Sequence, residues 1–178
     1  MNKVKVHFKD PFSYLSIGDF ISDHMDLNTI IVCIGTDRCI GDSLGPLVGT
    51  FLTEKDFPLP IYGTISEPIH ALNIDRKLSD IKLVHPNSNI IAIDACLGEH
   101  DNIGEIHARD YSIHPGKGVG KTLPHVGDAS IIGIVDSSES NIFINNKIRL
   151  DLIFNLAKVI TKSLFHSYQL NFDNKQIK

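Results

Sequence analysis

Two aspartates, Asp42 and Asp94, have the residue type and the placement that acid–base chemistry needs. Asp94 closes an apolar run at residues 89–94, and seven residues separate Asp42 from another apolar run at residues 30–34. Short apolar runs without alternation are typical of strands that are buried on both faces of a parallel sheet. Ligands bind beyond the carboxyl ends of such strands, where the chain leaves two neighbours in opposite directions. We therefore expect both carboxylates to face one crevice.

The chemistry of a close carboxylate pair follows from charge repulsion. Both groups cannot ionise easily, so one pKa rises and the other falls, which supplies one general acid and one general base. Such a pair can activate water against a peptide carbonyl. We expect carboxylate oxygens roughly 3–6 Å apart, with glycines 35 and 41 letting the loop fold back. Asp94 is the expected proton carrier, because a helix N-terminus favours the charged form of Asp42.

Two other interpretations of Asp42 and its neighbours stay open. Asp42 can simply cap a helix while Asp94 hydrogen-bonds a loop. Residues 41–45, Gly-Asp-Ser-Leu-Gly, also match the G-x-S-x-G pattern of a serine nucleophile. That pattern requires a sharp turn directly after a strand, and Ser43 follows the apparent strand end by nine residues. A serine hydrolase that uses Ser43 is therefore the weaker alternative.

A Gly-rich loop at residues 110–127 contains Gly116, Gly118 and Gly120. A phosphate-binding loop would need glycine at the position of Pro115, so we do not predict a nucleotide site. Long loops in compact domains are often functional, and we expect the three glycines to contact the substrate. The nine histidines show no metal-ligand spacing, so the sequence predicts no metal and no other cofactor.

The elements that must position the two aspartates are those of an α/β protein. Apolar patterns predict helices at residues 13–25, 43–52, 68–83 and 146–167, and strands at residues 30–34, 61–66, 89–94, 103–109 and 130–135. The link at residues 95–102 is too short for a helical crossover, so the fourth strand should run antiparallel. The first three strands should lie in the order 2-1-3. We predict one domain over residues 1–170, a three-layer α/β/α sandwich with a five-stranded mixed sheet, and a polar tail at 171–178.

Composition excludes several other classes of protein. The chain has 178 residues, 42% of them apolar, and a formal net charge of −4, which argues against direct nucleic-acid binding through bulk positive charge. No apolar run approaches the roughly 20 residues of a membrane helix. The N-terminal residues lack the apolar core of an export signal. Three cysteines are too few for a disulfide framework, so we expect a cytoplasmic protein.

Five segments together resemble the YyaC-type sporulation proteins, over about residues 12–164. They are Ile-Gly-Thr-Asp-Arg at 34–38, Gly-Asp-Ser-Leu-Gly-Pro at 41–46, Ile-Asp-Ala at 93–95, Pro-Gly-Lys-Gly-Val-Gly-Lys at 115–121 and Val-Gly-Asp at 126–128. That family is more remotely similar to the spore germination protease, which degrades small acid-soluble spore proteins. The germination protease in turn shares a three-layer fold with the hydrogenase maturation proteases, so the resemblance implies that fold for this chain.

The resemblance implies roles for the same two residues. Asp42 and Asp94 match the proposed catalytic acids of the germination protease. Hydrogenase maturation proteases hold nickel at these two positions and with a histidine in the region of His114, where this chain has its Gly-rich loop.

The implied function is that of a spore-associated endopeptidase in the cytoplasm of the spore or forespore. Its substrate would be a protein or peptide, with small acid-soluble spore proteins as candidates, and a homo-oligomer is left open. The alternative from another class is a catalytically silent regulatory or binding protein of sporulation on the same scaffold.

Overall fold

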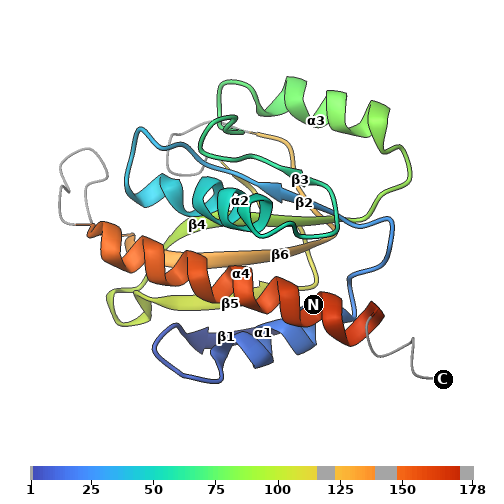
Figure 1. Ribbon diagram of the computed structural model, residues 1–178. Coiled ribbons are helices and arrows are strands. Elements are labelled where there is room, and N and C mark those ends of the chain that lie inside the picture. The colour runs from blue at the N-terminus through green and yellow to red at the C-terminus, as the bar shows by residue number, and fades with distance from the viewer. Residues whose placement is uncertain (1, 116–122, 139–147, 173–178) are drawn as a thin grey trace.

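The computed structural model describes residues 2–115, 123–138 and 148–172 (Figure 1). Along the chain the elements are β1 Lys3–His7, α1 Ser13–Ser22, β2 Ile30–Cys33, the short 3-10 helix η1 Gly41–Ser43, α2 Leu44–Glu54, β3 Ile61–Tyr62, α3 Ile74–Val84, β4 Ile90–Gly98, the 3-10 helix η2 His100–Asn102, β5 Glu105–Arg109, β6 Ala129–Ser137 and α4 Leu150–Phe172.

One mixed sheet contains all the described strands, in the order β1-β5-β6-β4-β2-β3. Strands β3, β2, β4 and β6 run parallel, and β5 is antiparallel to both β6 and β1. The order β3-β2-β4 confirms the predicted 2-1-3 arrangement. The antiparallel direction predicted for residues 103–109 is confirmed as well, because only η2 and a few further residues link β4 to β5.

The sheet has six strands rather than the five predicted, because β1 was not recognised in the sequence. Its residues alternate as Lys-Val-Lys-Val-His, with Val4 and Val6 packed against the core while Lys3 and Lys5 are exposed. An alternating strand with one solvated face has no apolar run. β1 also pairs with β5, about 100 positions later, so nothing near it in the sequence marks it as a strand.

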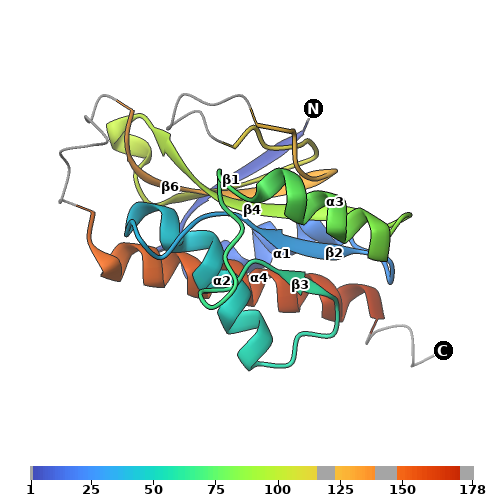
Figure 2. The same ribbon diagram turned by 90° about the horizontal axis from the view of Figure 1, so that it is seen from above.

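Helices cover both faces of the sheet, which confirms the predicted three-layer sandwich. Helices α1, α2 and α4 form one apolar core with one face of the sheet. Helix α3 packs on the other face through Ile74, Leu78 and Ile81. Figure 2 shows α3 and α4 on opposite sides of β2 and β4. Among the helices of the described ranges, none combines the length and the apolarity that a membrane span requires.

Several boundaries differ from those predicted. The strand predicted at 61–66 is only Ile61–Tyr62, because the backbone turns at Gly63 with a φ of 92°. The helix predicted at 68–83 begins later, since Ile69 forms a parallel bridge with Ile34. α4 continues through Phe172, into the predicted polar tail, where the Asn171 side chain donates hydrogen bonds to α1 and the residues that follow it.

Candidate active site

Asp94 lies at the carboxyl end of the parallel strands, where β2 stops and β4 continues. Cys33, the last residue of β2, pairs with Ile93, so Asp94 is the first residue of β4 beyond its neighbour. The residues two positions to either side, Ala92 and Cys96, pack in the core beneath α3, so the half-buried Asp94 side chain faces the same side. Its Oδ1 accepts a hydrogen bond of 2.8 Å from the backbone N–H of Ala95.

The loop after β2 folds back on itself and brings Asp42 to the same end of the sheet. The N–H of Thr36 donates to the carbonyl of Asp42 at 3.0 Å, which closes the loop. Gly35 makes this possible, because its φ of 141° favours glycine and a Cβ there would lie 2.0 Å from the Asp42 carbonyl oxygen. Gly41, which we expected to take a positive φ as well, does not.

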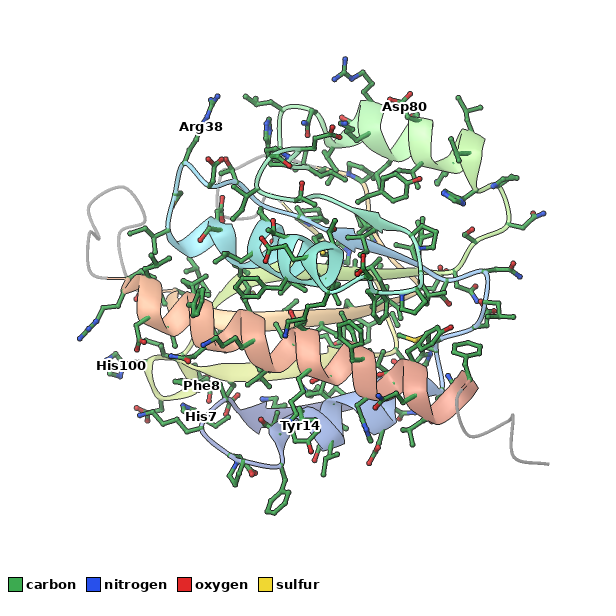
Figure 3. All side chains as sticks on the ribbon, viewed as in Figure 1. His7, Phe8, Tyr14, Arg38, Asp80 and His100 are labelled. Atoms are coloured by element: carbon green, nitrogen blue, oxygen red, sulfur yellow. The ribbon has the colours of Figure 1, made fainter. Side chains whose placement is uncertain are left out.

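A second close approach fixes the start of α2 against the end of β2. A Cβ on Gly45 would lie 2.1 Å from the carbonyl oxygen of Ile34, so only glycine fits between the helix and the strand. This packing places η1 in contact with β4. Arg38 stands on the same loop and extends outward, away from the sheet (Figure 3). The sequence therefore positions Asp42 through two glycine contacts and not through a cap.

The pKa values of the two carboxyls are both raised. Burial raises the pKa of Asp94 well above its ordinary value, and the nearby charge of Asp42 raises it further, against the lowering effect of the Ala95 N–H. Asp42 is exposed as a residue, yet the protein atoms around its carboxyl displace enough water to raise its pKa. Our expectation that the pKa of Asp42 falls is therefore wrong, because desolvation outweighs the helix N-terminus. Asp94 remains the stronger holder of a proton.

Helix capping does not account for Asp42. The residue that caps α2 is Ser43 and the residue that caps η1 is Ile40, and neither position makes a side-chain cap hydrogen bond. An acid that caps a helix stabilises it through such a bond. The carboxylate of Asp42 has no such structural task at either helix start.

Ser43 is poorly placed to act as a nucleophile. Its side chain is buried and its Oγ donates a hydrogen bond of 2.7 Å to the carbonyl of Ile40, so the hydroxyl proton points to a backbone acceptor rather than to a base. Ser43 ends a 3-10 helix and does not stand on a turn directly after a strand. Both requirements of a serine elbow are missing.

Gly116, Gly118 and Gly120 lie outside the described residues, so their contact with substrate stays a prediction. The base of their loop is described: Ile113 and Val126 exchange backbone hydrogen bonds of 2.9 and 3.1 Å. Both side chains belong to the core cluster that contains Ala92. The base of the loop therefore packs on the sheet face that carries Asp94.

The histidines of that loop do not complete a metal site with the aspartates. The rings of His114 and His125 lie with their centroids 3.6 Å apart at the base of the loop. Within the ranges that the structure describes, no group of three or more His, Cys, Asp or Glu side chains could hold a metal ion. The described residues thus do not form the three-ligand nickel site that the resemblance implies for hydrogenase maturation proteases.

A family model with the description "Protein of unknown function (DUF1256)" matches residues 5–163. The chain belongs to this family. It is 45% identical over 137 residues to the uncharacterized protein YyaC of Bacillus subtilis (strain 168), which covers 76% of this chain and 67% of that protein. This identity confirms the resemblance to the YyaC-type proteins. Among solved structures, a [NiFe] hydrogenase maturation protease, HycI from Thermococcus kodakarensis KOD1, aligns with a TM-score of 0.46 and 18% identity over 84% of this chain and 98% of that one.

Sequence reasoning missed a third aspartate of this DUF1256 protein at the same end of the sheet. Asp136 is the next-to-last residue of β6, and its Oδ1 accepts the N–H of Ser137 at 2.8 Å, as Asp94 accepts that of Ala95. Asp94 pairs with Ile132, four residues before Asp136, which corresponds to about 13 Å along the strand. Asp136 therefore stands apart from Asp94. The signal was an aspartate directly after an apolar run, as at Asp94.

Proposed function

We propose that this DUF1256 protein is a peptidase in which Asp42 and Asp94 activate water for hydrolysis of a peptide bond. One observation supports the proposal most directly: the loop after β2 returns Asp42 to the end of the sheet where β4 carries Asp94, and the charge of Asp42 helps to raise the pKa of Asp94. Asp42 caps neither helix, and the printed bond of Asp94 is to the backbone of the next residue. Acids with raised pKa values at such an edge are typical of catalytic sites.

The pKa shifts indicate which aspartate is the general acid and which is the general base. Asp94, whose pKa is raised more, holds a proton, and Asp42 is the carboxylate that accepts one. Asp42 removes a proton from water as the water oxygen bonds to the peptide carbonyl carbon, and Asp94 donates its proton to the carbonyl oxygen. In the second step the C–N bond breaks, the leaving nitrogen takes the proton held by Asp42, and Asp94 regains its proton from the gem-diol hydroxyl.

The resemblance to sporulation proteins supports a more specific setting. Small acid-soluble spore proteins are the first substrates to test, and the spore or forespore cytoplasm is the compartment in which the enzyme would meet them. The net charge of −4 favours a protein or peptide substrate over direct contact with nucleic acid.

The test is cleavage of small acid-soluble spore proteins by the purified full chain, with products identified by mass spectrometry. We expect defined fragments from the parent protein and none from Asp94→Asn, because the side-chain amide of asparagine has no acidic proton to give to the peptide carbonyl oxygen. Ser43→Ala should keep most of the activity. If Ser43→Ala were the inactive variant, the serine alternative would replace the aspartate pair. Absence of cleavage by any folded variant would favour the silent regulatory or binding protein.

A further inference from the structure

A pocket of about 190 Å³ opens at the carboxyl end of β6, outside the aspartate pair. It is lined by Ile103, Val135, Asp136, Ile148, Arg149 and Leu152. Sites for whole small molecules are typically about 300–1,000 Å³. An apolar cavity of about 150 Å³ holds one benzene ring. The pocket is therefore sized for a single aromatic or branched aliphatic side chain.

The wall of this pocket is in contact with the helix that carries Asp42. A Cβ built on Gly41 would lie 2.8 Å from Cδ1 of Ile148 and 3.7 Å from Cγ2 of Val135, both of which line the pocket. Gly41 directly precedes Asp42 in η1. The pocket therefore adjoins the backbone that carries Asp42, so a chain with one side chain in the pocket would pass close to Asp42.

The two charged residues of the pocket suit a peptide main chain. Arg149 is exposed and has only hydrogen-bond donors, which a peptide carbonyl can accept. Asp136 is half-buried and lines the pocket, and its carboxylate offers acceptors and no donor, which is the chemistry that a peptide N–H needs. One acid and one base around an apolar floor match an extended peptide better than a phosphate-bearing ligand, which would need several cations.

We propose that this pocket is the subsite that binds an apolar side chain of the peptide substrate, next to the bond that is cut. The proposal rests on the peptidase function of Asp42 and Asp94. It adds a substrate specificity. The substrate would carry a Leu, Ile, Met or Phe side chain at one fixed position near the scissile bond, and Ile148 and Leu152 would contact that side chain. Asp136 and Arg149 would form hydrogen bonds with the peptide main chain.

The test separates binding from catalysis by using the Asp94→Asn protein. A library of random hexapeptides is incubated with this variant, and the retained peptides are sequenced by mass spectrometry. We expect an apolar residue to be enriched at one position. Filling the pocket by Leu152→Trp in the same background should weaken binding of a selected peptide about tenfold or more, which corresponds to about 1.4 kcal/mol.

A matched control is available on the same helix. Leu150 is 57% exposed and does not line the pocket, so Leu150→Trp should leave peptide affinity unchanged. Arg149→Glu is a second pocket variant at an exposed residue, and it should also weaken peptide binding. It provides the test if Leu152→Trp does not fold. Retained peptides without apolar enrichment, or full affinity in both pocket variants, would overturn the subsite. Cleavage without apolar preference would overturn the subsite alone, whereas selective binding without cleavage by the parent would overturn only the peptidase.

Discussion

Acidic residues gather at both ends of the parallel strands, and the two groups are used differently. At the amino ends, Asp26 and Asp128 line a pocket of about 210 Å³ together with Asn89. Asp26 accepts hydrogen bonds from the N–H of Asn28, the hydroxyl of Thr29 and the amide of Asn89, and Asp128 accepts the N–H of Ile90.

The carboxyl ends present the opposite case. Asp42 makes no cap bond, and Asp94 accepts the N–H of the next residue, yet both carboxyls have raised pKa values. A carboxylate that satisfies donors at the start of a strand contributes to stability. A carboxyl whose pKa is raised by desolvation lowers stability when it ionises, so an activity that needs it is the simplest reason for its presence. We interpret this difference as one between acids that stabilise the sheet and acids that serve the proposed site.

The largest expected effect is on activity and at the carboxyl end. Asp42→Asn should reduce peptide hydrolysis about 100- to 10,000-fold, the range that a general base contributes. The fold should tolerate the change, because Asp42 caps neither helix. Initial rates on one cleaved substrate measure the loss of activity, and circular dichroism checks that the variant is folded. Asp128→Asn at the amino end is the matched control and should keep its rate, so a loss there as large as at Asp42 would break the comparison.

A smaller effect, on stability, is expected at the amino end. Asp26→Ala removes the acceptor of three hydrogen bonds, one of them from the buried Thr29, and should lower the free energy of unfolding by about 1–3 kcal/mol. Urea unfolding of the parent and the variant measures the difference. The rate of hydrolysis by the folded variant should be unchanged. An unaltered unfolding midpoint would show that these bonds are replaced by water.

The smallest effect is a gain in stability at the carboxyl end. Because the pKa of Asp94 is raised in the folded state, above pH 3.8 the unfolded chain has released this proton while the folded chain still holds it. The free energy of unfolding therefore falls as pH rises towards the folded pKa, by at most about 1.4 kcal/mol per pH unit. Asp94→Asn should flatten this slope and raise the free energy of unfolding near neutral pH, because the amide has no proton to lose on unfolding. Urea unfolding between about pH 5 and about pH 8 tests this, and a variant less stable than the parent at every pH would contradict it.

The sequence predicted the central part of the fold better than its edges. Runs such as residues 30–34 and 89–94 are apolar because their strands are buried on both faces, so their place and direction could be inferred. Edge strand β1 could not be recognised in this way, because one of its faces is solvated and its partner β5 is distant in the sequence. The strand predicted at residues 61–66 was too long, because the backbone turns at Gly63 although the residue pattern of a strand continues beyond it.

By itself the sequence placed Asp42 and Asp94 at the carboxyl edge, because strand order and handed crossovers leave few alternatives, but it did not single out Asp136 there. It also carried the two glycines, Gly35 and Gly45, that allow η1 to approach β4. Only the tertiary structure decided how the acids are charged and what surrounds them. The pKa of Asp42 depends on the atoms that displace water from it. The pocket combines Ile103, which follows η2, with residues of β6 and residues at and just before the start of α4. Desolvation and pocket shape depend on contacts between distant segments, which no local pattern encodes.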